Sequence, residues 1–192
     1  MIIDANFEGL KQIKNGDYVF EGNLESKENI EIHLNDRFVI RGSITTEKSI
    51  IAECGIKAGE GIEAGEGIKA GWGIEAGWGI EAGEGIKAGW GIKAGWGIEA
   101  GEGIEAGCGI KAGEGIKAGW GIKAGWGIEA GWGIEAGCGI KAGEGIEAGF
   151  RIFAGTSVYR SSKNCIKTIS CKRLIKGEIA FGQLIERGEK DG

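Results

Sequence analysis

The chain has 192 residues, of which 42% are hydrophobic and 27% charged, the balance of a soluble folded domain. Glycine occurs 41 times and proline never, and the formal net charge is −5. Periodic glycine without proline excludes collagen and argues against disorder, and the acidic balance makes a nucleic acid an unfavourable direct ligand. The chain shows neither the pattern of a secretory signal nor a long apolar run, so we expect a cytoplasmic protein without a membrane segment.

The first part of the chain is expected to be a cap followed by degenerate repeats. Residues 1–19 predict an N-terminal cap, as a strand or a short helix. From residue 20, apolar residues recur every six positions in two frames. The first frame holds Ile32, Phe38, Ile44 and Ile50, and the second holds Leu34, Ile40, Thr46 and Ala52. Terminal repeats of a solenoid are often degenerate, so we expect the solenoid to cover residues 20–160.

Residues 54–149 are perfect hexads of the form x-Gly-Ile-(Lys/Glu)-Ala-Gly. A helix would lose about 1 kcal/mol at each glycine, which disfavours a helical reading. Ile and Ala two positions apart share one face of a strand, with the Lys or Glu between them in solvent. The Gly-x-Gly that follows predicts a corner, where glycine can take a positive φ without strain. Short strands joined by corners predict an all-β, single-stranded parallel β-solenoid.

The length of one rung is open between two values. Three hexads give a triangular rung of 18 residues, and two give a flat rung of 12. The signs of the Lys and Glu residues do not decide between them, but isoleucine fills a triangular lumen better than a thin slab, so we favour 18. Residues 84–113 and 114–143 are identical except for Glu102 against Trp132, which indicates a duplication. The number of repeats can therefore change without loss of the fold.

The end of the chain departs from the hexads. The stretch CKRLIKGEIAFGQLIE contains two strand-like runs around Lys176 and Gly177. This pattern predicts a β-hairpin, within a C-terminal cap of residues 161–192, that covers the last rung.

The x position of the hexads holds only Trp, Glu or Cys. Trp and Glu exchange there even between the duplicated blocks, and an unpaired buried carboxylate is costly, so we expect x to point outward at the corners. Exposed apolar arrays mark interaction sites. With 18-residue rungs, Trp72 stacks over Trp90 and Trp78 over Trp96. The predicted partner-binding residues are Trp72, Trp78, Trp90, Trp96, Trp120, Trp126, Trp132, Glu84, Glu102 and Glu114.

Other interpretations of these positions remain open. Stacked Trp rings can simply stiffen a corner, or can join two copies in a symmetric homodimer. A column of Glu66, Glu84 and Glu102 could hold a cation, although no Asp or backbone ligand pattern accompanies it.

No catalytic arrangement stands out. Triangular hexapeptide-repeat acyltransferases and γ-type carbonic anhydrases place their small inward residue four positions after the aliphatic one, whereas here the spacing is two. The single histidine, His33, is expected to be solvated. The five cysteines contain no CxxC pair and are expected to be reduced thiols. We therefore expect no enzyme, no cofactor and no metal.

Two resemblances bear on the fold. VFEGNLESKENIEIHL and FVIRGSITTEKSIIAE resemble the rungs of bactofilins, the polymer-forming bacterial cytoskeletal solenoids. The hexads, with FRIFAG and GEIAFGQLIE, resemble Gly-Ile-x-Ala-Gly solenoid proteins of Firmicutes and their phages. The first resemblance implies self-assembly, and the second implies a solenoid but no activity.

These observations favour a non-enzymatic interaction protein that presents Trp and Glu at its corners to a protein partner. An acidic rod also fits a phage-type inhibitor of a host defence or nucleic-acid-handling protein. The alternatives are a self-assembling, bactofilin-like scaffold and a carbohydrate-binding solenoid.

Overall fold

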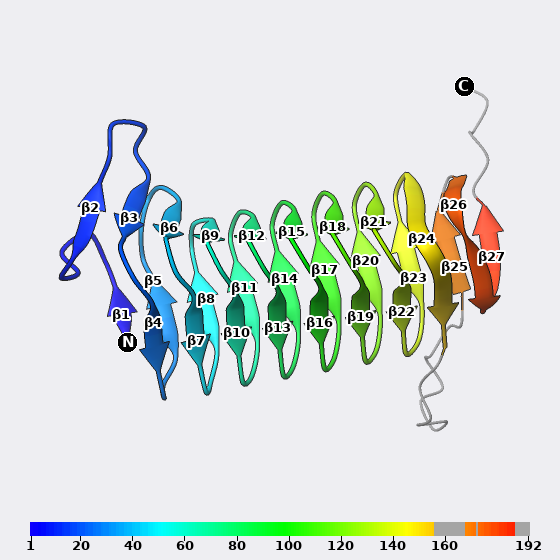
Figure 1. Ribbon diagram of the computed structural model, residues 1–192, viewed down its shortest axis with the longest axis horizontal. Coiled ribbons are helices and arrows are strands. Elements are labelled where there is room, and N and C mark those ends of the chain that lie inside the picture. The colour runs from blue at the N-terminus through cyan, green and yellow to red at the C-terminus, as the bar shows by residue number, and fades with distance from the viewer. Residues whose placement is uncertain (156–167, 172, 187–192) are drawn as a thin grey trace.

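The computed structural model describes residues 1–155, 168–171 and 173–186. It is an all-β rod in which parallel strands stack in about nine turns (Figure 1). Within the hexads each strand pairs with the strand 18 residues away, as Ile80 does with Ile98. The predicted β-solenoid with a triangular 18-residue rung is confirmed.

The strands form three faces, which we number in chain order along one rung. Face 1 contains β3 (Tyr18–Phe20), β6 (Phe38–Ile40), β9 (Ile56–Ala58), β12 (Ile74–Ala76), β15 (Ile92–Ala94), β18 (Ile110–Ala112) and β21 (Ile128–Ala130). Face 2 contains β4 (Leu24–Ser26), β7 (Ile44–Thr46), β10 (Ile62–Ala64), β13 (Ile80–Ala82), β16 (Ile98–Ala100), β19 (Ile116–Ala118) and β22 (Ile134–Ala136).

Face 3 is a separate ten-stranded sheet. It contains β1 (Ile2–Ile3), β5 (Ile30–Ile32), β8 (Ile50–Ala52), β11 (Ile68–Ala70), β14 (Ile86–Ala88), β17 (Ile104–Ala106), β20 (Ile122–Ala124), β23 (Ile140–Ala142), β25 (Thr168–Cys171) and β27 (Gln183–Glu186). Faces 1 and 2 are joined into one sheet because β24 (Gly145–Ala154) and β26 (Arg173–Phe181) continue around the corner between them.

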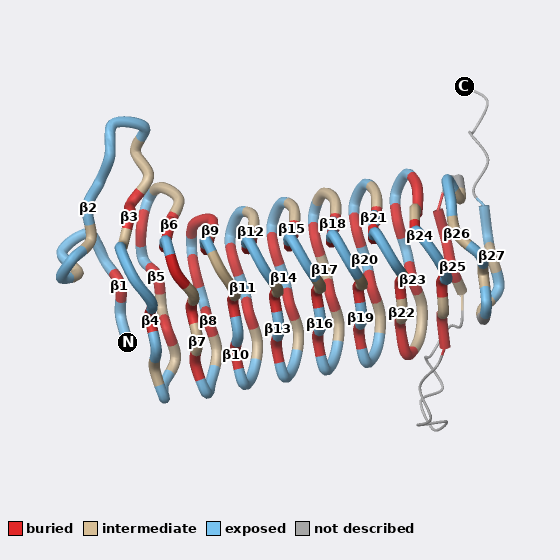
Figure 2. Tube along the Cα trace, viewed as in Figure 1, coloured by how far each residue is buried: buried red, intermediate tan, exposed pale blue. Residues whose placement is uncertain are grey.

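The lumen of the rod is filled by isoleucine and alanine. Every hexad isoleucine is at most 1% exposed, and the alanines two residues later are also buried, while the Lys or Glu between them is exposed or half-buried (Figure 2). The register places Ile on Ile and Ala on Ala in successive rungs. Each fully buried isoleucine contributes about 1.5–3 kcal/mol, so the repeated core is the main source of stability.

The two glycines of each corner have different roles, and neither takes a positive φ. Among the described residues, positive φ occurs only at glycines outside the hexads, so the hexad corners do not use the positive φ that glycine permits. A Cβ added to Gly77 would lie 1.9 Å from the carbonyl oxygen of Gly59, one rung earlier. A Cβ added to Gly79 would meet only the carbonyl oxygen of Gly97, at 3.6 Å. The glycine before x is therefore required for close stacking of backbones. The glycine after x has more room, with the nearest carbonyl oxygen from 3.1 Å at Gly133 to 3.6 Å at Gly79.

The first rung is longer than the hexad frame predicts. β5 begins at residue 30 and β6 at residue 38, whereas consecutive hexad strands begin six residues apart. Ile30 consequently pairs with Ile50, and Ile32 pairs with Ala52. The placement of Ile32 in the isoleucine frame is therefore wrong, because the corner at residues 33–37 holds two extra residues.

The two ends of the rod differ. At the N-terminal end β1 pairs in parallel with β5, and β2 (Leu10–Gln12) pairs antiparallel with β3. The described part of residues 1–19 contains no helix.

The predicted C-terminal hairpin is wrong. β26 runs unbroken through Lys176 and Gly177 and pairs in parallel with β24, and β25 and β27 are also parallel. Gly177 has φ +124° and lies against Ala148 and Ile152, so it marks a corner of the coil rather than a reversal of the chain. Residues 161–167, 172 and 187–192 of the predicted cap lie outside the described residues.

No helix in the described ranges is both long and apolar enough to cross a membrane.

Candidate functional site

The x residues stack in three columns, one at each corner of the rod. The amide of each x residue donates to the carbonyl of the x residue one rung earlier, as Trp96 does to Trp78 at 3.1 Å. The first column is Cys54, Trp72, Trp90, Cys108, Trp126 and Glu144. The second column is Glu60, Trp78, Trp96, Glu114, Trp132 and Phe150. The third column is Glu66, Glu84, Glu102, Trp120 and Cys138.

All seven Trp side chains are exposed, from 38% at Trp72 to 70% at Trp132. Their outward direction follows from the strand pairing, because Ile and Ala of each hexad occupy the lumen. Phe150 continues the second column and is 74% exposed. It lies six residues after Glu144, so the hexad frame could have identified it.

The cysteines depart from the expectation of exposed, reduced thiols. Cys54 is 1% exposed, one rung after the long corner at residues 33–37, and this burial raises the pKa of its thiol. Cys108 is a half-buried free thiol, and Cys171 is buried. Cys138 is disulfide-bonded, so the prediction of a reduced thiol is wrong there. Cys165 lies outside the described residues.

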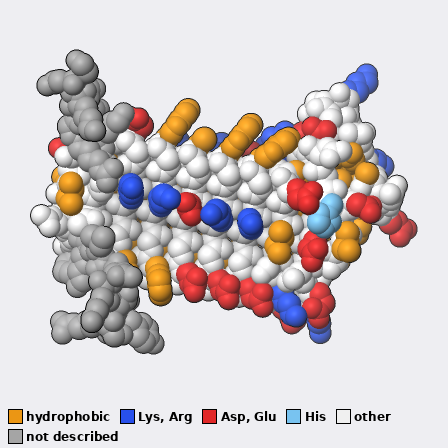
Figure 3. All heavy atoms as spheres, turned by 180° about the vertical axis from the view of Figure 1, so that it is seen from behind, with side chains coloured by type: hydrophobic (Ala, Val, Ile, Leu, Met, Phe, Trp, Pro, Cys, Tyr) orange, Lys and Arg blue, Asp and Glu red, His pale blue; other side chains and the backbone are white. Residues whose placement is uncertain are grey.

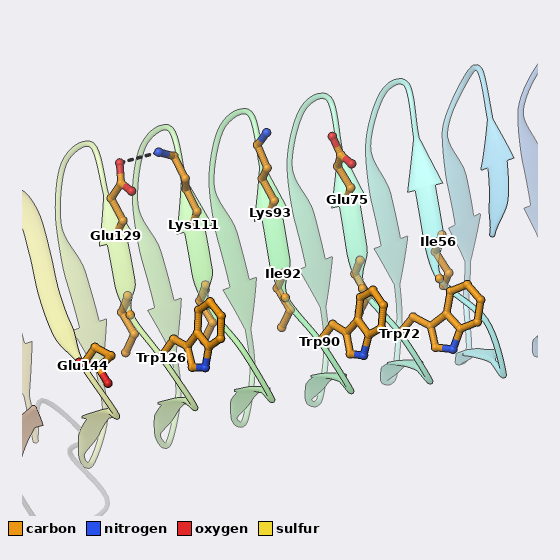
Figure 4. Close-up of a pocket in the computed structure, with 18 of the residues that line it drawn as sticks. Ile56, Trp72, Glu75, Trp90, Ile92, Lys93, Lys111, Trp126, Glu129 and Glu144 are labelled. Atoms are coloured by element: carbon orange, nitrogen blue, oxygen red, sulfur yellow. Dashed lines mark hydrogen bonds and ion pairs between the residues drawn. The ribbon is translucent and has the colours of Figure 1, made fainter. Parts of the chain in front are cut away.

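The predicted Trp pairs stack. The rings of Trp72 and Trp90 have centroids 5.9 Å apart and planes 15° apart. Those of Trp78 and Trp96 are 5.6 Å and 10° apart. In the first column the ring of Trp126 stands apart from this pair, with one rung between (Figure 4). The backbone ladder thus stacks one pair of indoles in the first column and one pair in the second.

Each Trp column borders a shallow groove that runs along the neighbouring face. The groove over face 1 has a volume of 790 Å³ and lies beside Trp72, Trp90 and Trp126 (Figure 4). The groove over face 2 is larger, at 1300 Å³, and lies beside Trp78, Trp96, Trp132 and Phe150. The face 2 groove therefore offers the larger partly apolar surface.

The faces carry different charges. Within the hexads, face 1 has equal numbers of Lys and Glu at its outward strand positions: Lys57, Glu75, Lys93, Lys111, Glu129 and Glu147. Face 2 is acidic: Glu63, Glu81, Glu99, Lys117 and Glu135. Face 3 is basic: Lys69, Lys87, Glu105, Lys123 and Lys141. Figure 3 shows the lysine row of face 3 beside the acidic third column. This sorting cannot be found until the rung length is known.

Ion pairs between rungs neutralise part of these rows. Lys117 Nζ lies 2.7 Å from Glu99 Oε1, and Lys123 Nζ lies 2.7 Å from Glu105 Oε1. The hydrogen bond that Lys123 donates lowers the pKa of Glu105. These side chains are more than 40% exposed, so each pair contributes only about 0–1 kcal/mol. On face 2, Glu63 and Glu81 pair in register with no cation between them, which keeps the face acidic.

The predicted site residues separate into three groups. The second column brings Trp78, Trp96, Glu114 and Trp132 together, and the first column brings the other Trp residues together except Trp120. Glu84 and Glu102 lie with Trp120 in the third column, away from both Trp-rich corners. Among the described residues no group of three or more His, Cys, Asp or Glu side chains is placed to hold a metal ion.

His33 is a surface residue. Its side chain is 45% exposed, and its Nδ1 lies 3.1 Å from Glu53 Oε1. This hydrogen bond raises the pKa of His33, with a smaller contribution from Glu31.

Comparison with protein-family models, with curated proteins and with solved structures found no match for this chain.

Proposed function

We propose that the protein is a non-enzymatic binding module that receives a basic protein partner on face 2 and the second column. The supporting observation is that exposed Trp78, Trp96 and Trp132 border a face on which glutamates outnumber lysines four to one. Aromatic anchors beside complementary charge are the usual composition of the energetically important part of an interface.

The corner geometry favours binding without reorganisation. The indoles project from backbone positions that are hydrogen-bonded to both neighbouring rungs, so little conformational entropy is lost at the backbone on binding. Each indole can bury a large apolar area against a partner. The glutamates of face 2 would speed the approach of a basic surface, and this effect weakens as salt increases.

Affinity capture from cells of the native host, followed by mass spectrometry, tests the proposal. The bait carries Trp96→Ala and Trp132→Ala, with Trp90→Ala and Trp126→Ala as the matched control in the first column. We expect a basic partner that binds the wild type and the control, is lost with the second-column variant, and is released by added salt. A partner equally sensitive to both pairs, or no partner at all, would count against face 2.

Self-association is the second candidate, and the opposite charges of faces 2 and 3 favour it. The acidic row of one copy could pair with the basic row of another, because both rows repeat with the same rung. Light scattering across protein concentration, at low and high salt, distinguishes the two functions. Large assemblies that dissolve in high salt would favour the scaffold, and a monomer at all salt concentrations would favour the binding module.

A further inference from the structure

The groove over face 2 is built from the same three positions in each rung. In the rung that contains β16, Trp96 stands at the corner, Gly97 follows it, and Glu99 is the outward residue of the strand. Ile98, between Gly97 and Glu99, is buried in the lumen, so both of its neighbours face outward. Equivalent positions line the groove in every rung from residue 60 to residue 135. The groove is therefore a trench with the corner column on one side, the outward row of face 2 on the other, and glycine along its floor.

Close stacking of the rungs does not explain the glycine floor. A Cβ added to Gly97 would meet only the carbonyl oxygen of Gly115, at the ordinary contact distance of 3.4 Å, and Gly97 does not have a positive φ. All hexads nevertheless have glycine after x. A longer side chain at this position would project into the trench, so the repeat leaves the trench open along its whole length. Figure 4 shows the equivalent trench over face 1, with the indoles in one row and the strand side chains in another.

The repeat along the trench matches a polyproline II helix. Two rungs span about 9.6 Å. A polyproline II helix repeats every three residues, or about 9.3 Å, and so differs from two rungs by only about 0.3 Å. Two turns of an α-helix cover about 10.8 Å and differ by about 1.2 Å, and an extended strand repeats about every 6.8 Å. At the two-rung interval the corner column has Trp96 and Trp132, and the outward row has Glu63, Glu99 and Glu135.

The indoles offer the hydrogen-bond donors that such a helix lacks. A polyproline II segment has no internal hydrogen bonds, and proline has no N–H, so its carbonyl groups take donors from outside. Trp96 and Trp132 are exposed, and within the described part of the chain nothing accepts a hydrogen bond from their indole N–H groups. Grooves lined by aromatic side chains are the usual recognition site for proline-rich segments.

The carboxylates of the outward row favour a ligand with positive charge. Glu63, Glu81 and Glu135 make no ion pair with a described residue. Glu99 pairs with Lys117, but both side chains are more than half exposed, so a basic group of a ligand can replace this contact. The groove over face 1 also has a glycine floor and three indoles, whereas its lysines and glutamates are equal in number. It therefore serves as an internal control for charge.

We propose that the groove over face 2 binds a proline-rich segment in the polyproline II conformation, with Arg or Lys at every third residue. The prolines pack against Trp96 and Trp132, and the basic side chains lie along the glutamates.

This inference rests on the proposed function, because it specifies the segment by which a basic partner is recognised. The two fail separately. A purified chain that ignores proline-rich peptides leaves the capture of a basic partner untouched, and a host without a partner leaves the peptide titration unchanged.

The experiment titrates the full chain with a peptide of three Pro-Pro-Arg repeats and follows the indole N–H signals in ¹H–¹⁵N NMR spectra, assigned with single Trp→Phe variants. The peptide is about 28 Å long, and the groove from residue 60 to residue 150 covers about 24 Å. We expect saturable shifts at Trp96 and Trp132, and weaker binding at Trp90 and Trp126.

Two control peptides carry the same number of arginines. Three Gly-Ser-Arg repeats keep the spacing in sequence but lack the stiff conformation, and three Pro-Pro-Pro-Arg repeats keep the conformation but place arginine about every 12.4 Å. Both should bind at least about fivefold more weakly, because the first loses more conformational entropy and the second loses the match to two rungs.

Matched variants test the trench itself. Gly97→Leu fills the floor over face 2, and Gly109→Leu fills the floor over face 1, where an added Cβ also lies 3.4 Å from the nearest carbonyl oxygen. Gly97→Leu should weaken binding of the Pro-Pro-Arg peptide at least about fivefold, and Gly109→Leu should leave it unchanged. Melting temperatures of both variants distinguish a filled groove from a lost fold.

A second variant keeps the backbone unaltered. Glu63→Gln combined with Glu135→Gln should weaken binding and reduce its dependence on salt. Both residues are at outward positions that hold either Lys or Glu in other hexads, so the double variant is expected to fold. Equal affinity for the Gly-Ser-Arg peptide, an unchanged Kd in a folded Gly97→Leu or in the double variant, or no saturable shift at Trp96 and Trp132 would each overturn the proposal.

Discussion

The two glycines beside Trp78 give a matched test of how the rungs stack. In Gly77→Ala the new methyl group would lie 1.9 Å from the carbonyl oxygen of Gly59 and 2.9 Å from its carbonyl carbon. Both are backbone atoms, so no side chain can rotate to relieve the overlap. In Gly79→Ala the methyl group would meet only one oxygen, at the ordinary contact distance of 3.6 Å.

The magnitude follows from the contacts that the methyl group would disrupt. The rungs would have to separate by more than about 1 Å at this corner, because carbon and oxygen do not approach closer than roughly 3.2 Å. The hydrogen bonds from Gly77 to Ala58 and from Trp78 to Glu60, at 3.0 and 3.1 Å, would then be lost. Two such bonds at about 1 kcal/mol each, with about 1–3 kcal/mol for overpacking, predict a loss of about 3–5 kcal/mol. Gly79→Ala should instead stabilise by about 0.4–1 kcal/mol, because it restricts the unfolded chain.

Urea unfolding followed by far-ultraviolet circular dichroism and by Trp fluorescence measures both changes in the free energy of unfolding. Hydrogen exchange of the Trp78 amide supplies a local measurement, with protection expected to fall in Gly77→Ala only. If the two variants differ by less than about 1 kcal/mol, the assignment of separate roles to the two corner glycines is refuted.

Four further changes test the core and the surface electrostatics. NMR titration should give His33 a pKa above 6.5, and this pKa should fall in Glu53→Gln. The stability that the contact between His33 and Glu53 contributes is complete below pH 6.5 and is lost as pH rises through the folded-state pKa. The hydrogen bond from Arg37 lowers the pKa of Asp17 below 3.8. The stability that this bond contributes is therefore complete above pH 3.8 and is lost as pH falls through the folded-state pKa. Asp17→Asn should make stability less dependent on pH over this acidic range in an acid-unfolding curve. Ile98→Ala, in the lumen, should cost about 2–5 kcal/mol in urea unfolding, and a loss below 1 kcal/mol would contradict a close-packed core. Lys117→Gln should cost less than about 1 kcal/mol in the same assay, since its partner Glu99 is also exposed.

The sequence was sufficient to predict the fold and the direction of the corner residues. A strict period of six, with Ile and Ala two positions apart, permits only one inward face for each strand. A rung of 18 residues places Trp90 directly above Trp72, so their stacking follows from the sequence. Residues that are one rung length apart in the sequence stack on each other, so a perfect repeat makes such contacts predictable.

The predictions of backbone structure that are wrong concern residues outside the perfect repeat. Ile32 was misplaced because nothing in its own rung shows that the corner at residues 33–37 is longer. Cys54, the one buried x residue of the hexads, lies one rung after the same corner. Lys176-Gly177 predicts a hairpin turn, but a glycine between two strand-like runs fits a solenoid corner equally well. The local sequence does not distinguish the two. The close approach at Gly77 depends on an adjacent rung and leaves no trace in the local sequence.

The charge of each face could not be predicted from the sequence alone. Over all hexads the outward strand positions hold equal numbers of Lys and Glu, so their composition gives no net charge. Only the assignment of each strand to a face separates the acidic row with Glu81 and Glu99 from the basic row with Lys69 and Lys87.

The rung length gives the duplicated block an unexpected geometry. A copy displaced by thirty residues advances the coil by one full rung of 18 residues and two further faces. Each duplicated x residue therefore lies in a different column from its original. Trp90 stands in the first column and its duplicate Trp120 in the third, while Glu84 stands in the third and its duplicate Glu114 in the second. Recombination within such a gene would lengthen the rod and reshuffle its outer pattern in a single event, leaving the interior untouched. New surfaces can thus arise here without a single point mutation.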